Sequence, residues 1–276
     1  MSKFLHNLNR MVSIIIVNYN TKNFIIQCLN SIGKYAPKDT EVIVVDNAST
    51  DESMEEIKIT NQKLKVIENK ENLGYAKAVN QGIKVAKGDY LFILNPDTKL
   101  TKDAIDKLLE FTKIHPDAGV VAPQLLNSDG SVQPSCYHEP TIFNAIKEYF
   151  LGIKSAYDKY APRGNTPKQV DAVVGAAMFI PKITIEKVGL LDERFFMYFE
   201  DLDFCRRVRR SGLSVYYLPT SEIFHEHGGV TRTVPEQARN WLIQSSIIYH
   251  GRVKHTLLTI VLWLGQKWKR LVEFSQ

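Results

Sequence analysis

Val12-Ser-Ile-Ile-Ile-Val-Asn-Tyr-Asn20 joins an apolar, mostly β-branched run to a polar end. A run of this length and composition is typical of a buried strand, and it is too short to cross a membrane. The apolar residues that follow, from Phe24 to Ile32, recur at helical spacing. The segment therefore predicts a strand, a loop and a helix in that order.

The same unit recurs further along the chain. Apolar strands are expected at Glu41–Val45, Leu64–Ile67 and Tyr90–Leu94, and helices from Ser53 and over Tyr75–Ala86. Continuous apolar strands that alternate with helices indicate a parallel sheet with both faces covered. The predicted fold class is thus α/β, with a Rossmann-like, mostly parallel sheet flanked by helices.

The sequence changes character after a helix expected over Thr101–Ile114. Residues 133–163 are rich in aromatic residues, proline and glycine and lack steady periodicity. Strands are predicted at Gly119–Ala122, Val170–Ile180 and Val215–Leu218, and helices at Pro181–Val188, from Glu200 to Ser211 and at Pro235–His250. One domain is therefore expected over residues 1–250, followed by a helical tail over 251–276.

Size and composition limit the possible functions. With 276 residues and 44% hydrophobic content, the chain can bury a sizeable core. The formal net charge of +5 does not match a dedicated nucleic-acid binder and fits an anionic membrane surface or phosphorylated ligands better. The three cysteines, Cys28, Cys136 and Cys205, are odd in number and widely spaced, which predicts free thiols. No apolar stretch of signal-peptide length begins the chain, so a cytoplasmic location is expected.

The tail carries a short apolar stretch, Leu257–Leu264, that cannot span a bilayer. Basic residues surround it, and Trp263 and Trp268 accompany them. This composition predicts a basic amphipathic helix that is suited to rest on a membrane surface. The alternative is a C-terminal helix packed on its own domain.

Phe196-Met-Tyr-Phe-Glu-Asp-Leu-Asp-Phe-Cys-Arg-Arg207 crowds acidic side chains behind an aromatic run. If a helix begins at Glu200, Asp203 and Arg207 lie one turn apart and can form an ion pair. Asp201 then faces an apolar surface, where burial opposes the charged form while the helix dipole favours it. A general base is one use for such a carboxylate, and an acidic helix-capping turn is the alternative.

Other polar groups follow the predicted strands, at the sheet edge where ligands bind in this architecture. Asn95-Pro-Asp97 closes one strand, and Asp97 is suited to a divalent cation, although this tripeptide is also a common turn. Asp46-Asn-Ala-Ser-Thr-Asp51 suits a ribose or a nucleobase, or else caps the next helix. Gly74, which precedes a helix, permits close approach of a ligand to the backbone.

Two histidines occur in His225-Glu-His227-Gly-Gly229. On an extended segment their side chains point to opposite sides, so one can ligate a metal while the other does not. The alternative for each is a solvated loop histidine.

The chain resembles glycosyltransferase family 2, with the GT-A fold, and in particular its rhamnosyltransferase-like branch. The motifs that carry the resemblance are Val12-Ser-Ile-Ile-Ile-Val-Asn-Tyr-Asn20, Val45-Asp-Asn-Ala-Ser49, Asn72-Leu-Gly-Tyr-Ala76, Leu94-Asn-Pro-Asp97, Gly175-Ala-Ala-Met178 and Asp192-Glu-Arg-Phe-Phe-Met-Tyr-Phe-Glu-Asp-Leu-Asp203. Each motif is modest, but their order and spacing together are specific, and they cover residues 11 to about 240. The resemblance implies that residues 1–250 form a GT-A catalytic domain.

The resemblance also implies roles for single residues. Asn18, Asp46, Gly74, Asn95 and Gly175 fall at positions of the nucleotide-sugar site. Asp97 matches the last residue of the family's Asp-X-Asp metal motif, in which Asn95 replaces the first aspartate.

For metal binding, His225 matches a histidine that completes the metal site in some relatives and lies downstream of the Asp-X-Asp motif. His227 is the alternative ligand. For catalysis, Asp201 matches the base, and Glu200, Asp203 and Arg207 would support it.

The implied reaction is transfer of rhamnose or a hexose, from dTDP-rhamnose or a UDP-sugar, to a hydroxyl with inversion at the anomeric carbon. Mg²⁺ or Mn²⁺ would neutralise the leaving diphosphate. A glycan or a lipid-linked glycan is the implied acceptor, in cell-surface polysaccharide synthesis. Two alternatives remain: a sugar-phosphate nucleotidylyltransferase, which the lack of a glycine-rich loop after the first strand disfavours, and a non-catalytic nucleotide-sugar-binding protein.

Overall fold

The computed structural model describes residues 11–59, 64–226 and 235–273. Within these residues, a nine-stranded sheet has the order β3-β2-β1-β4-β10-β6-β11-β5, with β8 also paired to β11, and β7 and β9 form a separate pair. The strands are β1 (Val12–Asn18), β2 (Glu41–Asp46), β3 (Leu64–Glu68), β4 (Tyr90–Leu94), β5 (Thr98–Leu100), β6 (Ala118–Leu126), β7 (Cys136–Tyr137), β8 (Lys168–Gln169), β9 (Ala172–Val173), β10 (Ala177–Pro181) and β11 (Ser214–His225).

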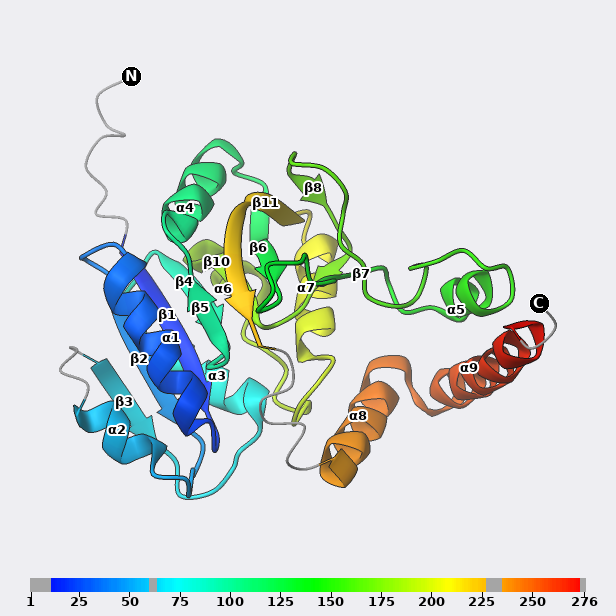
Figure 1. Ribbon diagram of the computed structural model, residues 1–276, viewed down its shortest axis with the longest axis horizontal. Coiled ribbons are helices and arrows are strands. Elements are labelled where there is room, and N and C mark those ends of the chain that lie inside the picture. The colour runs from blue at the N-terminus through cyan, green and yellow to red at the C-terminus, as the bar shows by residue number, and fades with distance from the viewer. Residues whose placement is uncertain (1–10, 60–63, 227–234, 274–276) are drawn as a thin grey trace.

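Helices cover both faces of this sheet (Figure 1). The described helices are α1 (Lys22–Tyr35), α2 (Ser53–Ile59), α3 (Tyr75–Val85), α4 (Ala104–Ile114), α5 (Ile142–Tyr149), α6 (Lys182–Val188), α7 (Glu200–Arg210), α8 (Pro235–His250) and α9 (Arg252–Glu273).

The first strand explains the two-sided core. All of β1 is buried, and it pairs in parallel with β2 on one side and β4 on the other. Because side chains alternate along a strand, Ile15 and Val17 pack in the cluster that contains α3 and α7. Ile14 and Ile16 pack in the opposite cluster, with α1 and α4. The predicted α/β fold with a mostly parallel, helix-covered sheet is confirmed.

Three of the predicted strands have clearly different bounds in the structure, and the one expected at Gly119–Ala122 runs over Ala118–Leu126 as β6. The strand expected over Val170–Ile180 is interrupted. Val174, Gly175 and Ala176 connect β9 to β10 and belong to neither strand. The backbone N–H of Val174 instead donates to Ser135, and the carbonyl of Ala176 accepts from Asn95. β10 runs antiparallel to β4 and β6, so the sheet is mixed.

The strand predicted over Val215–Leu218 is much longer and forms β11, which ends at His225. A register shift between Leu218 and Glu222 lets it continue alongside β6 and then pair with β5. This extension determines where His225 lies.

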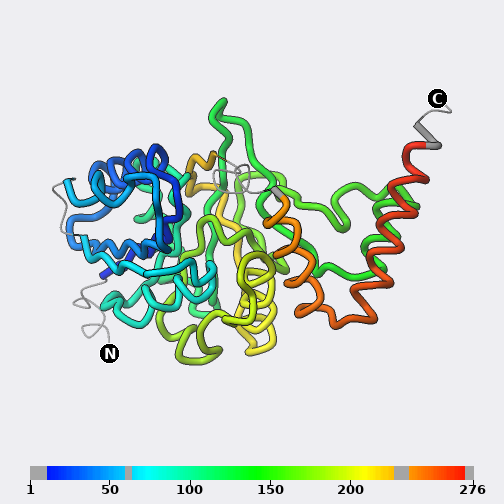
Figure 2. Tube along the Cα trace, turned by 90° about the horizontal axis from the view of Figure 1, so that it is seen from below, coloured from blue at the N-terminus to red at the C-terminus, as the bar shows by residue number. Residues whose placement is uncertain are grey.

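α5 and α9 form an arm that projects from the sheet domain, and the two helices lie side by side in both ribbon and tube views (Figures 1 and 2). Gly265 permits this contact, because a Cβ atom there would lie 2.5 Å from Cβ of Tyr149. The predicted C-terminal helix is therefore present, and its packing partner is a helix within the aperiodic segment 133–163. None of the described helices is long and apolar enough to span a membrane.

The predicted free thiols are also confirmed. Cys28, Cys136 and Cys205 are all buried and none forms a disulfide in the described chain.

Candidate active site

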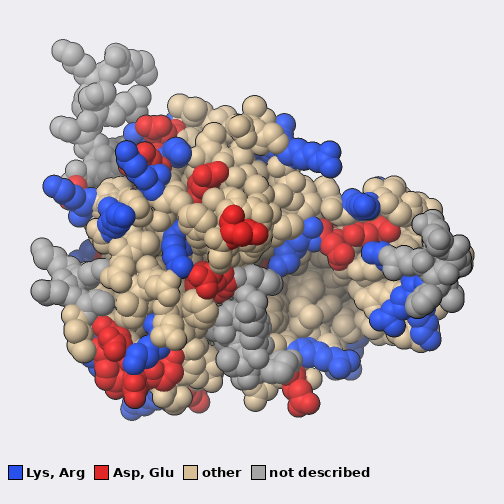
Figure 3. All heavy atoms as spheres, viewed as in Figure 1, with Lys and Arg blue, Asp and Glu red and all other residues tan. Residues whose placement is uncertain are grey.

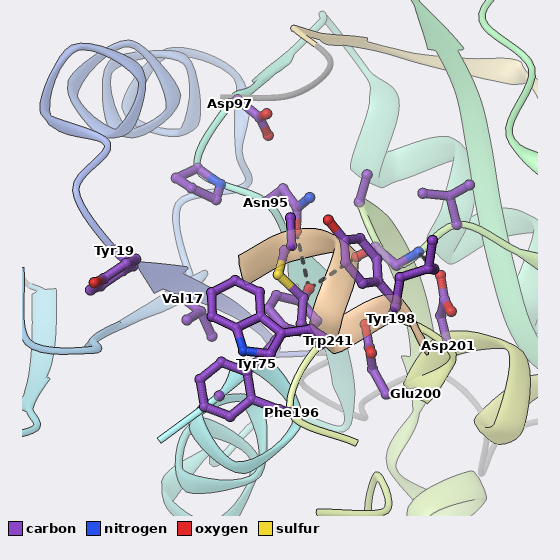
Figure 4. Close-up of a pocket in the computed structure, with 18 of the residues that line it drawn as sticks. Val17, Tyr19, Tyr75, Asn95, Asp97, Phe196, Tyr198, Glu200, Asp201 and Trp241 are labelled. Atoms are coloured by element: carbon purple, nitrogen blue, oxygen red, sulfur yellow. Dashed lines mark hydrogen bonds between the residues drawn. The ribbon is translucent and has the colours of Figure 1, made fainter. Parts of the chain in front are cut away.

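A cavity of about 530 Å³ opens beyond the carboxyl ends of β1 and β4. Its walls come from the loops after these strands, from the start of α7 and from α8. Figure 4 shows Asp97 at one end of the cavity and Glu200 and Asp201 at another, with Tyr75 and Asn95 between them. The cavity thus brings together several of the side chains that the sequence pointed to.

The acidic pair begins α7 after an unusual backbone turn. Tyr198 and Phe199 have φ angles of 70° and 65°, in the left-handed region that non-glycine residues rarely occupy. Such strain is retained when the surrounding structure requires it, and here it turns the chain so that Glu200 and Asp201 line the cavity.

Backbone donors hold the carboxylate of Asp201. The N–H groups of Gly175 and Leu202 donate to its two oxygens at 2.9 and 2.8 Å. Burial raises the pKa of Asp201, while these two hydrogen bonds and the charge of Lys159 oppose the rise. Ionised Asp201 is thus stabilised in a site that also makes it basic.

Glu200 differs from its neighbour. Burial, followed by the charge of Asp201, raises the pKa of Glu200 well above its usual range. Within the described part of the chain, Oε2 of Glu200 has no hydrogen-bond partner. Two adjacent buried carboxyls do not both ionise readily, and the hydrogen bonds favour the charge on Asp201. The shared proton therefore resides mainly on Glu200.

Asp203 and Arg207 lie outside the cavity wall. The predicted ion pair one turn apart is confirmed, with Nε of Arg207 2.7 Å from Oδ2 of Asp203. Asp203 also accepts from Arg206, and Arg207 donates to the carbonyl of Val188. These contacts fix the first turn of α7 and hence the position of the acidic pair.

Asp97 and His225 meet because β5 pairs antiparallel with the end of β11, with Thr98 opposite His225. Both side chains are buried, and Nε2 of His225 lies 3.4 Å from Oδ1 of Asp97. Nδ1 of His225 lies 2.6 Å from Oε1, the side-chain amide oxygen of Gln133, which can only accept. Nδ1 therefore carries a proton, and Nε2 faces Asp97.

This donor set fits a hard or borderline divalent cation. A carboxylate oxygen and an imidazole nitrogen converge at the cavity wall, and the second ring nitrogen is held by an outer partner, as in many metal sites. Among the described residues no cluster of three or more His, Cys, Asp or Glu side chains is suited to a metal, so other ligands would come from substrate or water. His227 lies outside the described residues.

Asn95, Gly74 and Gly175 all line the cavity. The hydroxyl of Tyr75 lies 3.0 Å from Oδ1 of Asn95 and 3.1 Å from the carbonyl oxygen of Gly175, and its single proton is shared between these two acceptors. Gly74 has a φ angle of 85°, and a Cβ atom there would lie 2.7 Å from the carbonyl oxygen of Phe196. Only glycine fits this close approach of two backbone segments.

Asn18 and Asp46 are buried behind the cavity. Nδ2 of Asn18 donates to Oδ1 of Asp46 at 2.8 Å and to the hydroxyl of Ser53 at 2.8 Å. Their neighbours Tyr19 and Asn47 line the cavity instead. The two predicted residues thus fix the loops that carry cavity-lining side chains.

Several further residues of the cavity were not predicted from the sequence. Trp241 and Arg239 enter it from α8, and the ring of Trp241 lies 4.8 Å from that of Phe196 between centroids (Figure 4). Lys159 reaches it from the aperiodic segment, and burial lowers the pKa of its amine. No local pattern marks these positions, because only tertiary packing brings them to the acidic pair.

Solved structures that share this fold are GT-A glycosyltransferases. GalNAc-T7, solved with UDP, GalNAc and Mn²⁺, aligns with a TM-score of 0.63 and 18% identity over 80% of this chain and 44% of that one. The mannosyltransferase PcManGT from Pyrobaculum calidifontis, solved with GDP-Man and Mn²⁺, aligns with a TM-score of 0.59 and 19% identity over 92% of this chain and 69% of that one. This chain thus spans less than half of GalNAc-T7, and at these identities the likeness concerns the fold.

The profile of "Glycosyl transferase family 2" matches residues 13–167, which is more than half of the chain. The protein belongs to glycosyltransferase family 2. Hexosyltransferase Agl10 of low-salt glycan biosynthesis in Haloferax volcanii is 29% identical over 91% of this chain and 81% of its own. N-acetylglucosaminyl-diphospho-decaprenol L-rhamnosyltransferase of Mycobacterium tuberculosis is 26% identical over 82% of this chain and 79% of its own. The predicted GT-A fold and family, with its rhamnosyltransferase-like relatives, are confirmed.

Proposed function

We propose that the protein is a metal-dependent, inverting glycosyltransferase that moves rhamnose or a hexose from a nucleotide-diphosphate donor to a hydroxyl group. The observation that carries the proposal is the shared cavity, in which Asp201 and the Asp97–His225 pair occupy separate ends. Inversion in one displacement needs a base on the acceptor side and charge neutralisation on the leaving-group side. Asp201 meets the first requirement, and the Asp97–His225 pair meets the second through a bound cation.

Asp201 is the general base. The acceptor hydroxyl loses its proton to Asp201 as its oxygen attacks the anomeric carbon and the bond to the diphosphate breaks. Glu200, which holds the shared proton, keeps a second charge away from the reacting centre. Asp203 and Arg207 act through the helix, because their ion pair fixes the turn that carries the base.

On the leaving-group side, Asp97 and His225 would hold Mg²⁺ or Mn²⁺, which when bound neutralises charge on the diphosphate. Gln133 keeps the metal-binding nitrogen of His225 directed at the cavity. Asn95, Gly74 and Gly175 line the nucleotide-sugar pocket, and Asn18 and Asp46 hold the loops behind it.

The relatives suggest the substrates. Besides the mycobacterial enzyme, whose name gives a lipid-linked acceptor, dTDP-rhamnosyl transferase RfbF of Shigella flexneri is 25% identical over 92% of this chain and 81% of its own. We therefore propose dTDP-rhamnose or a UDP-sugar as donor and a glycan or lipid-linked glycan as acceptor, in cell-surface polysaccharide synthesis. Catalysis is assigned to residues 1–250, at the cytoplasmic face of a membrane that the basic tail contacts.

The test is nucleotide release and product mass with UDP-, GDP- and dTDP-sugars, a short-chain lipid-linked acceptor and Mn²⁺. Wild type is compared with Asp201→Asn, and with Asp129→Asn as a matched change in an exposed turn. We expect metal-dependent transfer by wild type and Asp129→Asn, and a loss of about 10²–10⁴-fold in Asp201→Asn. Equal, metal-independent background from all three proteins would remove the transferase function and leave a non-catalytic binding protein.

A further inference from the structure

A second cavity, of about 410 Å³, lies between the start of α5, the side of α7 and the junction of α8 and α9. It shares no lining residue with the catalytic cavity. It therefore sits at the root of the arm, where the arm joins the sheet domain.

Basic side chains dominate the polar lining of this second cavity. Arg206, Arg210, His250 and Lys254 contribute to it from three helices. Nε of Arg206 and Nε2 of His250 are shielded from solvent and have no hydrogen-bond partner in the described chain. Neither Arg210 nor Lys254 forms an ion pair with any described residue. Arg210 and Lys254 thus bring two cations without carboxylate partners among the described residues to the wall of this cavity.

The only acidic side chain in the described lining, Glu139, is already engaged. Its Oε1 accepts from the hydroxyl of Tyr249 at 2.7 Å, and its Oε2 pairs with Arg209. Nη2 of Arg206 donates a hydrogen bond to Oδ1 of Asp203. The guanidinium carbon of Arg206 lies 3.9 Å from the centroid of the Tyr249 ring. The carboxylates of Glu139 and Asp203 therefore do not neutralise all of the cations in the lining, and the cavity keeps a net positive charge.

The lowered pKa of His250 agrees with the positive charge of this cavity. Burial, then the nearby charges of His255, Arg206 and Lys254, lower the pKa of His250 to about 4, although Glu139 opposes them. His250 is therefore neutral at pH 7.

The surroundings of the second cavity are apolar. Phe143 and Leu258 line it, and Phe143 is largely exposed. Exposed apolar side chains then continue along α9 at spacings of three and four residues, which places them on one helix face: Val253, Leu257, Ile260, Leu264 and Trp268. Lysine and arginine side chains gather over this arm (Figure 3).

We propose that the second cavity binds the phosphate group of a lipid, with the apolar tail of the lipid lying along the arm. Arginine, lysine and a neutral histidine are the donors that proteins use for phosphate, and an apolar strip beside them suits a hydrocarbon chain. A free phosphate would need no such strip. The phosphate can come from a membrane phospholipid or from a polyprenyl diphosphate that carries a glycan, since both present the same group. The site does not depend on the transferase activity.

The test measures binding of dihexanoyl phosphatidic acid, dihexanoyl phosphatidylcholine, a short-chain polyprenyl diphosphate and inorganic phosphate to the full chain by calorimetry, below micellar concentrations. Arg210→Ala combined with Lys254→Ala removes two cavity cations that have no catalytic role. Lys267→Ala combined with Lys269→Ala removes the same charge from the arm outside the cavity. Circular dichroism confirms that each variant is folded.

We expect both phosphate-bearing lipids to bind while phosphatidylcholine does not. The cavity variant should lose roughly 100-fold in affinity, since each hydrogen bond to a charged group contributes about tenfold, and the control should lose less than about threefold. Preference for the diphosphate assigns the site to the acceptor, and preference for phosphatidic acid assigns it to the membrane. Equal losses in both variants, equal affinity for inorganic phosphate, or no binding would each overturn the proposal. Unchanged transfer to a water-soluble acceptor separates this outcome from failure of the catalytic site.

Discussion

Replacing Glu200 with glutamine tests which of two adjacent carboxyls carries the proton. Glu200 is buried, has no partner for Oε2 among the described residues, and its pKa is raised by burial and by the charge of Asp201. Asp201 receives two backbone hydrogen bonds. Glutamine reproduces the shape and neutrality of protonated Glu200, so Glu200→Gln should keep activity within about tenfold of wild type at pH 7. Asp201→Asn should lose about 10²–10⁴-fold, or about 3 to 5 kcal/mol of transition-state stabilisation.

Stability should respond to pH with a definite sign. The folded pKa of Glu200 lies above its unfolded value of about 4.3, so its contribution is fully present below that pH and is lost as pH rises through the folded pKa. Each unit of difference between the two pKa values is worth about 1.4 kcal/mol. Glu200→Gln has no such loss. Its melting temperature should therefore rise relative to wild type as pH increases above about 4.3.

Two assays check these expectations: initial rates across pH, and thermal unfolding followed by circular dichroism in the same buffers. Glu55→Gln is the matched control, because Glu55 is exposed on α2 and the chemical change is the same. In wild type the rate should fall as acid protonates Asp201, whose pKa burial raises. The reasoning is refuted if Glu200→Gln is as inactive as Asp201→Asn, or if wild type gains stability relative to Glu200→Gln as pH rises.

Three further changes probe the packing around the cavity and the arm. Gly74→Ala places a Cβ 2.7 Å from the Phe196 carbonyl at a φ of 85°, so thermal unfolding should report a loss of about 1–3 kcal/mol, and an unchanged melting temperature would contradict this. Gln133→Leu removes the partner of Nδ1 of His225 and should weaken Mn²⁺ binding about 10–100-fold by calorimetry with nucleotide present; equal affinity would argue against a metal at His225. Gly265→Leu should wedge α9 away from α5 and speed its proteolysis while transfer to a soluble acceptor persists, whereas equal protease resistance would mean that the contact is not close.

The elements with strong local patterns could be predicted from the sequence. β1, β2 and β4 are continuous apolar runs, and α3 and α7 begin where glycine and acidic residues indicated. The end of β4 supplies Asn95 and Asp97, so these two cavity residues followed from the rule that ligands meet the carboxyl ends of parallel strands.

Contacts between distant segments could not be predicted in this way. Gln133 comes after a turn with no periodicity, and it reaches His225 only because β11 continues past a register shift. Nor does local sequence distinguish Asn18, which lies behind the cavity, from Asn47, which lines it. Both are buried polar residues that follow or end strands, and only the packing of neighbouring loops decides which of them borders the cavity.

α8 links the two cavities and gives the C-terminal part a role in both. Its first turns bring Arg239 and Trp241 to the acidic pair, and its last residues, Tyr249 and His250, line the basic cavity at the root of the arm. Ser245 fixes the helix in between by donating to the carbonyl of Met197, beside the strained turn that positions Glu200 and Asp201. A shift of α8 on lipid binding would therefore act on the wall of the first cavity and on Asp201 together. For this reason, truncation before α8 should abolish transfer even to soluble acceptors, whereas truncation after His250 should leave such transfer intact and weaken only lipid binding.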